Sequence, residues 1–188
     1  MIKAKRCGFS IIELMVVIGV IAILAALLFP ALRAHFEGAR INEMKAQLGV
    51  FEGALEQYQR AFGDYPPSGG AGQDDENPGI ERMLACLRTE ENGGPFIQAH
   101  LIRRWVEDTD GDGRQELVDP WRNPWIYFHS SEYPAGAVYY RIKGRQMTVA
   151  PIKKSGRFAN STSYQLWACG PNQTDQSGQD DDVGKVGR

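Results

Sequence analysis

The feature that most constrains this chain is an apolar run near its N-terminus that contains a single acid. Residues 9–29 form a 21-residue segment, and residues 14–29 carry no charged side chain. As a helix rising about 1.5 Å per residue, the segment would span roughly 31 Å, which is close to the hydrocarbon thickness of a bilayer. The acid is Glu13, and a carboxylate inside a membrane costs about 2.5–3.5 kcal/mol. The sequence therefore predicts a membrane-spanning helix in which Glu13 has a specific purpose.

Two simpler interpretations explain this run less well. A secretory signal peptide has an apolar core of about 7–15 residues, and the small-residue cleavage pattern around Ala31 to Ala34 is weak. An uncleaved single-pass anchor fits the length, and Lys3, Lys5 and Arg6 would then hold the N-terminus in the cytoplasm. The simple anchor leaves Glu13 unexplained.

The stretch "GFSIIELMVVIGVIAILAALLFPAL" resembles the N-terminal signature of type IV pilins and of the pseudopilins of type II secretion. That signature is a basic leader ending in Gly, then Phe, then Glu at the fifth mature position, which correspond here to Gly8, Phe9 and Glu13. The resemblance implies that a prepilin peptidase cleaves between Gly8 and Phe9 and N-methylates Phe9. It also implies that Glu13 meets the terminal amine of a neighbouring subunit during assembly. A buried carboxylate opposite a buried ammonium is tolerable, whereas either group alone is not.

The C-terminal half narrows the resemblance to the major, G-type pseudopilin of type II secretion. The segments that carry it are "VDPWRNPWIYFH" and "SYQLWACGPNQTDQSGQDDDVG". The first matches an Asp-Pro-Trp-Gly-Asn-Pro motif, with Arg122 in place of the usual Gly and with matches at Asp119, Pro120, Trp121, Asn123 and Pro124. In that family the C-terminal loop binds calcium, which implies as ligands Asp175, Asp180, Asp181 and Asp182. The resemblance covers roughly the first 60 residues and residues 119–183, and it gives the insert at 88–118 no counterpart.

That insert contains a second candidate calcium loop, "DTDGDGRQELVD" at residues 108–119. Calcium prefers about 6–8 hard oxygen ligands, and the loop fits the D-x-D-x-D-G pattern with Gly113 at the turn. The expected ligands are Asp108, Asp110, Asp112, the carbonyl of Arg114, Glu116 and Asp119. Asp119 stands where the longer Glu is usual, and the flanking helices of an EF-hand are not evident. The alternative is a solvated acidic hairpin.

The rest of the chain predicts a small head attached to the same helix. Apolar residues from Ile41 to Phe62 follow at spacings of three and four, which favours an amphipathic helix on the sheet of its own domain over a coiled coil. Gly63 and "DYPP" should end this helix, and Pro30 should kink it. A short helix is expected at 80–87, and strands are expected at 124–129, 137–144, 145–152 and 163–170.

The predicted fold is therefore α+β, with a long N-terminal helix packed on a small antiparallel sheet, as in pilins. The expected divisions are a leader at 1–8, a transmembrane and assembly helix at 9–29, an amphipathic half of the helix at 30–63, and a head with calcium-type loops at 64–188. Cys7 belongs to the leader. Cys86 and Cys169 in the head form either a disulfide, which an external compartment permits, or two buried thiols.

No catalytic pattern is evident, and the three histidines are scattered, so an enzyme is not expected. Loss of the three leader cations lowers the formal net charge from −2 to −5, which leaves no basic surface for nucleic acid.

Two functional classes compete. One is a filament subunit of a type II secretion pseudopilus, or of a type IV pilus for adhesion, motility or DNA uptake. The other is a membrane-anchored domain that binds calcium or another ligand. The first class implies as partners a prepilin peptidase, copies of the chain, other pseudopilins and an inner-membrane assembly platform. It also implies a single pass through the bacterial inner membrane, with a cytoplasmic N-terminus and a periplasmic head that enters a periplasm-spanning filament.

Overall fold

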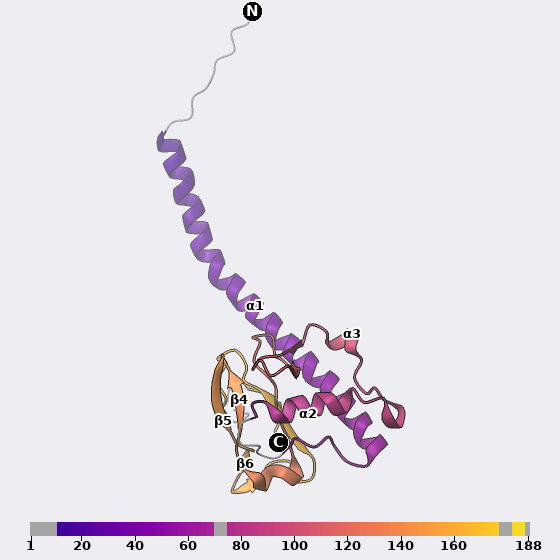
Figure 1. Ribbon diagram of the computed structural model, residues 1–188. Helices are drawn as coiled ribbons and strands as arrows, with labels where there is room; N and C mark the ends of the chain where they lie inside the picture. The colour runs from indigo at the N-terminus through magenta and orange to yellow at the C-terminus, as the bar shows by residue number, and fades with distance from the viewer. Residues whose placement is uncertain (1–10, 70–74, 177–181, 187–188) are drawn as a thin grey trace, which may run out of the picture. The chain divides into compact units, whose positions relative to one another are not determined.

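A computed structural model describes residues 11–69, 75–176 and 182–186, and for residues 30–34 it describes only the backbone. The chain divides into two compact units, Met1–Ala39 and Arg40–Arg188. The helix α1 (Ile11–Phe62) contributes to both units (Figure 1).

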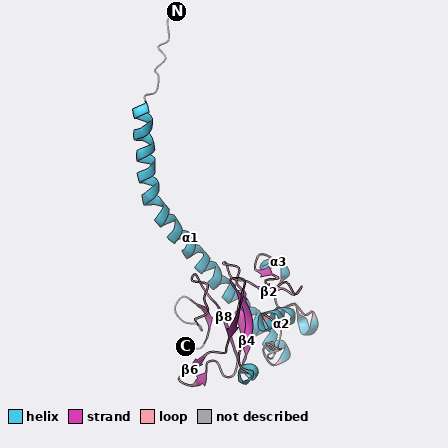
Figure 2. Ribbon diagram, turned by 60° about the vertical axis from the view of Figure 1, so that its left-hand side comes forward, coloured by secondary structure: helices cyan, strands magenta, loops and turns pink. Residues whose placement is uncertain are grey.

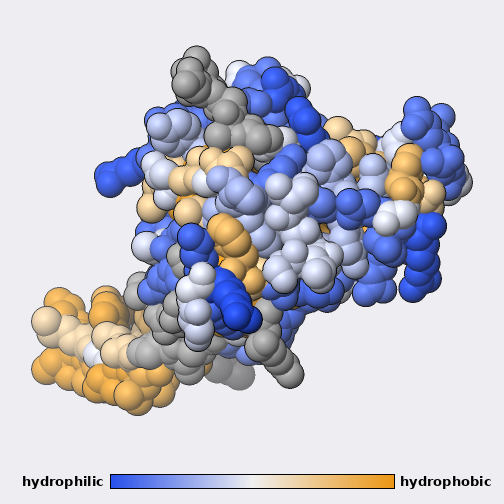
Figure 3. Space-filling view, turned by 90° about the horizontal axis from the view of Figure 1, so that it is seen from below, coloured by the Kyte–Doolittle hydropathy of each residue, from blue (hydrophilic) through white to orange (hydrophobic). Residues whose placement is uncertain are grey.

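The described part of the first unit is the N-terminal stretch of α1. The stretch Ile11–Phe29 is long and apolar enough to cross a membrane, and none of it is buried within the chain. Its large apolar side chains are exposed, and Figure 3 shows part of this apolar surface in orange. The predicted apolar helix is thus confirmed. The helix continues through Pro30 without a break, and the expected kink there stays a prediction.

The second unit begins with the remainder of α1, whose apolar stripe enters the core. Met44, Phe51 and Leu55 are fully buried. The helix ends at Gly63, which has φ 86° and whose N–H donates a 2.8 Å hydrogen bond to the carbonyl of Gln59. A left-handed residue at this position is a common way to end a helix, and glycine adopts it without steric cost. Both the packing of the stripe and the end of the helix confirm the prediction.

Within the described residues, the strands of the second unit form four small antiparallel sheets. The largest has the order β3–β8–β9, and the others are the pairs β1–β2, β4–β5 and β6–β7. The strands are β1 (Val106–Glu107), β2 (Glu116–Leu117), β3 (Ile126–His129), β4 (Val138–Ile142), β5 (Arg145–Val149), β6 (Lys153–Lys154), β7 (Arg157–Phe158), β8 (Tyr164–Ala168) and β9 (Val183–Lys185). The helical elements of this unit after α1 are α2 (Pro78–Leu87), η1 (Glu91–Gly93), α3 (Ala99–Ile102) and η2 (Ser130–Ala135).

The four expected strands are present as β3, β4, β5 and β8, but the expectation of a single sheet is wrong. β4 and β5 pair through a tight turn in which Lys143 and Gly144 both have positive φ. The other edge of β4 is occupied by the segment before α2, because Glu76 bridges to Tyr139 and the N–H of Asn77 donates to the Tyr139 carbonyl at 2.9 Å. β4 therefore has no edge available for β3, and the sheets remain separate.

Helix α2 packs closely on β3 and also contacts β2 and β4. Figure 2 shows α2 beside β2 and β4. Gly79 permits this approach, since a Cβ atom there would lie 2.2 Å from the carbonyl oxygen of Tyr127. Aromatic rings fill the space between α1 and the strands, including Phe51 edge-on to Trp125 with ring centroids 5.3 Å apart. Helices and small antiparallel sheets thus share one core, and the α+β class is confirmed.

No disulfide joins Cys86 to Cys169 in this structure. Cys86 is half-buried on α2 and hydrogen-bonds with the side chain of Tyr58, whereas Cys169 is buried directly after β8. Whether these residues form a disulfide or remain two thiols in the external compartment stays a prediction. Cys7 lies outside the described residues.

Candidate functional site

The first functional candidate is the start of α1. Glu13 lies in the first turn of the helix, where the helix dipole favours a negative charge. Its neighbours Ile12 and Leu14 are 72% and 52% exposed within the single chain. The expected cleavage and methylation residues, Gly8 and Phe9, lie outside the described residues.

The second candidate is an acidic cluster, defined here as Glu81, Asp110, Asp112 and Glu116. Each residue offers one carboxylate oxygen, and these oxygens all lie within 4.8 Å of one another. Glu81 comes from the first turn of α2, whereas Asp110 and Asp112 lie in the loop between β1 and β2 and Glu116 begins β2. The cluster therefore joins two segments that are far apart in the sequence.

The β1–β2 loop is held in shape by its own side chains. Both carboxylate oxygens of Asp108 accept backbone hydrogen bonds, from Gly111 at 2.7 Å and from Gly113 at 3.0 Å. Oε2 of Glu116 accepts from the N–H of Thr109 at 2.7 Å. Asp108 thus closes the turn from within, while Glu116 is fixed at the base of the loop.

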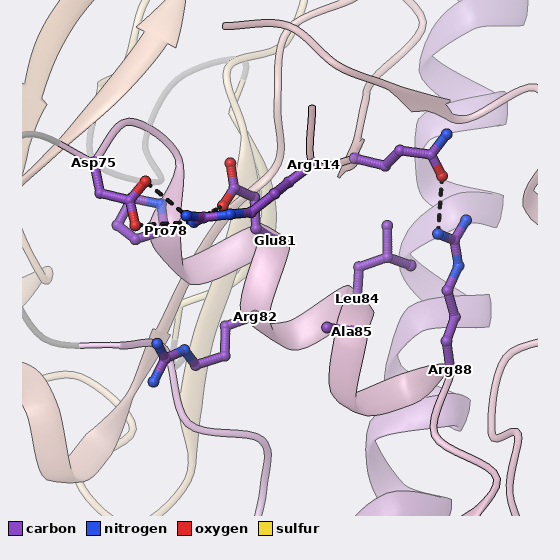
Figure 4. A pocket seen from close by; sticks show the side chains of 9 residues that line it. Asp75, Pro78, Glu81, Arg82, Leu84, Ala85, Arg88 and Arg114 are labelled. Atoms are coloured by element: carbon purple, nitrogen blue, oxygen red, sulfur yellow. Dashed lines mark hydrogen bonds and ion pairs between the residues drawn. The ribbon is translucent and has the colours of Figure 1, made fainter. Parts of the chain in front are cut away.

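Arg114 brings a cation to the cluster. Its Nη1 lies 2.9 Å from Oε2 of Glu81 and 3.1 Å from Oδ2 of Asp75, and its Nε lies 3.3 Å from Oδ2 of Asp112. Figure 4 shows the guanidinium between the carboxyl groups of Asp75 and Glu81. The sequence predicted a role for the Arg114 carbonyl oxygen, and the structure adds a role for its side chain.

Electrostatics in the cluster oppose full ionisation. Burial raises the pKa of Glu81, and the hydrogen bond from Arg114 only partly opposes this effect. Burial likewise raises the pKa of Glu116 and of Asp110. Removing a carboxylate from water disfavours its charged form, so a compensating positive charge is worth more here than on an open surface.

Asp119, the expected last ligand of the loop, has a different local role. Its Oδ1 accepts hydrogen bonds from the N–H groups of Trp121 and Asn123 at 2.8 and 2.9 Å, and burial raises its pKa to about 6. Within this turn Arg122 has φ 68°, a conformation that favours glycine. Of the six residues expected as ligands in this loop, the structure brings together Asp110, Asp112 and Glu116.

The C-terminal loop is only partly described. Asp175 accepts a 3.0 Å hydrogen bond from the indole N–H of Trp167, and Asp182 accepts a 2.9 Å bond from the N–H of Gln176. Asp180 and Asp181 lie outside the described residues, and calcium binding at this loop stays a prediction.

Sequence reasoning missed Glu81 and Asn77. Glu81 lies beside apolar Ile80 in a segment expected to be helical. Its side chain is only 5% exposed in the structure, which the neighbouring sequence does not indicate. Asn77 is fully buried with φ 56°, and its Nδ2 donates to Thr109 Oγ1 at 3.0 Å and to Asp110 Oδ2 at 3.2 Å. The burial of both residues depends on how α2 packs, so no local signal in the sequence could have pointed to the cluster.

Comparison with known proteins adds independent evidence on the class of protein. A family model described as the prokaryotic N-terminal methylation motif matches residues 3–29. Type II secretion system core protein G of Pseudomonas aeruginosa is 28% identical over 125 residues, which cover 66% of this chain and 75% of the relative. Core protein G of Klebsiella pneumoniae is 28% identical over 113 residues, which cover 60% of this chain and 75% of the relative. Fimbrial protein EcpB of Eikenella corrodens is 44% identical over 52 residues, which cover 28% of this chain and 33% of the relative.

The methylation motif, the long apolar helix and the α+β head together define a type IV pilin-like protein. Within this class the chain is similar to core protein G of type II secretion systems over about two thirds of its length. The resemblance drawn from the sequence is thereby confirmed. No solved structure matches the chain significantly. These three relatives carry the names of secretion-system and fimbrial proteins rather than of enzymes.

Proposed function

We propose that this chain is a structural subunit of a type II secretion pseudopilus. A prepilin peptidase removes residues 1–8 and methylates Phe9, and the mature chain then assembles with its own copies and with other pseudopilins on an inner-membrane platform. The filament that results helps to drive protein export.

The observation that carries this proposal is the start of α1. The methylation motif covers residues 3–29, and Glu13 lies in the first turn of α1, in the stretch Ile11–Phe29 whose large apolar side chains are exposed. Such a helix suits an apolar environment all round, either lipid or the packed helices of neighbouring subunits. The amine of a neighbour's Phe9 would compensate the carboxylate of Glu13.

The proposal includes a membrane orientation. The leader is basic, with Lys3, Lys5 and Arg6 ahead of the apolar stretch, and basic flanks remain in the cytoplasm. The second unit then lies in the periplasm, and the chain passes once through the bacterial inner membrane before it enters the filament.

A type IV pilus subunit is the second candidate. It is favoured by the relative from Eikenella corrodens, which is a fimbrial protein and whose 44% identity is higher than that of the core G proteins, although over a shorter stretch. The wider coverage of the core G proteins favours the pseudopilus.

Assembly of a Glu13→Ala variant tests the proposal. Removing one partner of a buried ion pair costs about 3–5 kcal/mol, so the amount of filament recovered by shearing and sedimentation should fall more than tenfold. Membrane insertion should persist or improve, because an acid leaves the apolar segment. Glu37→Ala, which removes an exposed acid further along α1, is the matched control and should assemble. Normal filaments from Glu13→Ala would refute the assembly role.

A further inference from the structure

The spacing of the acidic cluster suits one metal ion. Calcium binds oxygen ligands at 2.3–2.6 Å, so two ligands of the same ion lie at most about 5 Å apart. The oxygens offered by Glu81, Asp110, Asp112 and Glu116 all satisfy this limit, at 4.8 Å or less. Four carboxylates from two separate segments thus converge at the reach of a single ion.

Two of these carboxylates are buried and incompletely paired. Glu116 is fully buried and Glu81 is 5% exposed. In each, Oε1 has almost no contact with solvent and no hydrogen-bond partner among the described residues. The two carboxyl groups lie within hydrogen-bonding reach of one another, so a proton held by one can satisfy the other, whereas two ionised groups cannot satisfy each other. When both groups are ionised, their buried oxygens lack a donor, and the pair then favours a positively charged ligand.

Arg114 supplies positive charge from one side only. Its guanidinium contacts Glu81 and Asp112, whereas Oε1 of Glu116 receives no hydrogen bond from this or another cation among the described residues. The Arg114 side chain is 58% exposed and also holds Asp75. It can therefore swing away from the cluster and keep one of its carboxylate partners.

The remaining contacts keep the ligands in place from outside the cluster. Asn77 donates to Asp110, Thr109 donates to Glu116, and Asp108 closes the loop. Both oxygens of Asp110 accept a hydrogen bond, Oδ2 from Asn77 and Oδ1 from the N–H of Asp112, and each keeps a second lone pair for an ion. The site can thus bind an ion without a large rearrangement of the backbone.

We propose that Glu81, Asp110, Asp112 and Glu116 bind a calcium ion that takes the place of the Arg114 guanidinium and joins α2 to the β1–β2 loop. The ligand set consists of carboxylates alone, which suits a hard cation rather than zinc or copper. Magnesium is the poorer fit, because it demands near-octahedral geometry and gives up water reluctantly. The site is separate from the C-terminal loop and does not depend on filament assembly.

The test is calorimetric titration of calcium chloride into the full chain in detergent after treatment with chelator. Glu116→Gln and Asp112→Asn should each abolish one calcium-binding event or weaken it at least tenfold. Glu56→Gln removes an exposed acid on α1, away from the cluster, and should bind as the unchanged chain does. Asp182→Asn assigns any second event to the C-terminal loop. Equal binding in Glu116→Gln, Asp112→Asn and the unchanged chain would overturn the proposal.

Arg114→Gln gives an outcome of the opposite sign. Because the guanidinium must leave before the ion can bind, its removal should tighten calcium binding severalfold. If Arg114 only neutralises a solvated loop, Arg114→Gln leaves the calcium titration unchanged. That result would show that calcium does not displace the Arg114 guanidinium. Calcium should also raise the melting temperature of the unchanged chain and of Glu56→Gln but not of Asp112→Asn. This readout serves even if Glu116→Gln folds poorly, since Asp112 is exposed.

Discussion

The indole N–H of Trp125 donates a 3.0 Å hydrogen bond to Oε1 of Gln47, and both side chains are buried. Gln47 lies on α1 and Trp125 directly precedes β3, so this bond crosses the core of the second unit. The amide is the polar partner that lets a tryptophan lie against a helix without an unpaired donor.

A double-mutant cycle should reveal this bond. Gln47→Leu leaves the indole N–H buried without an acceptor and should lower the free energy of unfolding by about 1–3 kcal/mol. In a Trp125→Phe background there is no N–H to satisfy, so the same change should cost much less. Urea denaturation of residues 40–188 measures both values. Equal costs in the two backgrounds would mean that the hydrogen bond contributes nothing.

Two glycines should respond in opposite directions to the same substitution. Gly79→Ala places a Cβ atom 2.2 Å from the Tyr127 carbonyl oxygen, so α2 must move off β3 and stability should fall by several kcal/mol. Gly53→Ala, in the α1 helix with no atom within 4 Å of its Cβ, should raise stability by about 0.5–1 kcal/mol. Thermal unfolding of the two variants checks the contrast, and a tolerated Gly79→Ala would contradict the close packing of α2.

Asp119 should make the stability of the second unit fall as the pH rises. Its folded pKa of about 6 lies above the ordinary value of 3.8, so between about pH 4 and 6 the folded state holds the proton more tightly than the unfolded state. A shift of this size corresponds to roughly 3 kcal/mol at most, lost across that window. Asp119→Asn keeps an oxygen that accepts from the N–H groups of Trp121 and Asn123, and it should remove the loss of stability between about pH 4 and 6.

Denaturant titrations of Asp119→Asn and the unchanged chain at several pH values measure this difference. Asp64 provides a control of opposite sign, because the hydrogen bond from the Tyr65 N–H lowers its pKa. The stability that Asp64 contributes is present above its ordinary pKa and lost as the pH falls. Parallel curves for Asp119→Asn and the unchanged chain would exclude a raised pKa at this position.

Processing should depend on Gly8. A bulky residue such as Phe in its place should hold the chain at precursor length in the membrane, whereas Gly19→Ala, in open space on α1, should be processed normally. Mass spectrometry of the mature protein should find N-methylated Phe9 as its first residue. An N-terminus near Ala34 would instead identify an ordinary signal peptide.

The elements that could be predicted from the sequence are those set by neighbours along the chain. The stripe from Ile41 to Phe62 and the stop at Gly63 are periodic or local signals, and the structure has both. The separation of β4 from β3 was missed, because it depends on Asn77 occupying a strand edge more than 60 residues away. Glu81 was missed for the same reason, since only the packing of α2 brings it to Asp110 and Asp112.

The apolar surface of Ile11–Phe29 also sets a mechanical order of events. Fourteen large apolar side chains in this stretch are 46–78% exposed in the single chain. At about 1.5–3 kcal/mol each, moving them from an apolar environment into water would cost roughly 20–40 kcal/mol. A domain of this size is typically stable by only about 5–15 kcal/mol. When force pulls the head away from the apolar environment of the helix, the head is thus expected to unfold first. The helix is the last part of the subunit to be released.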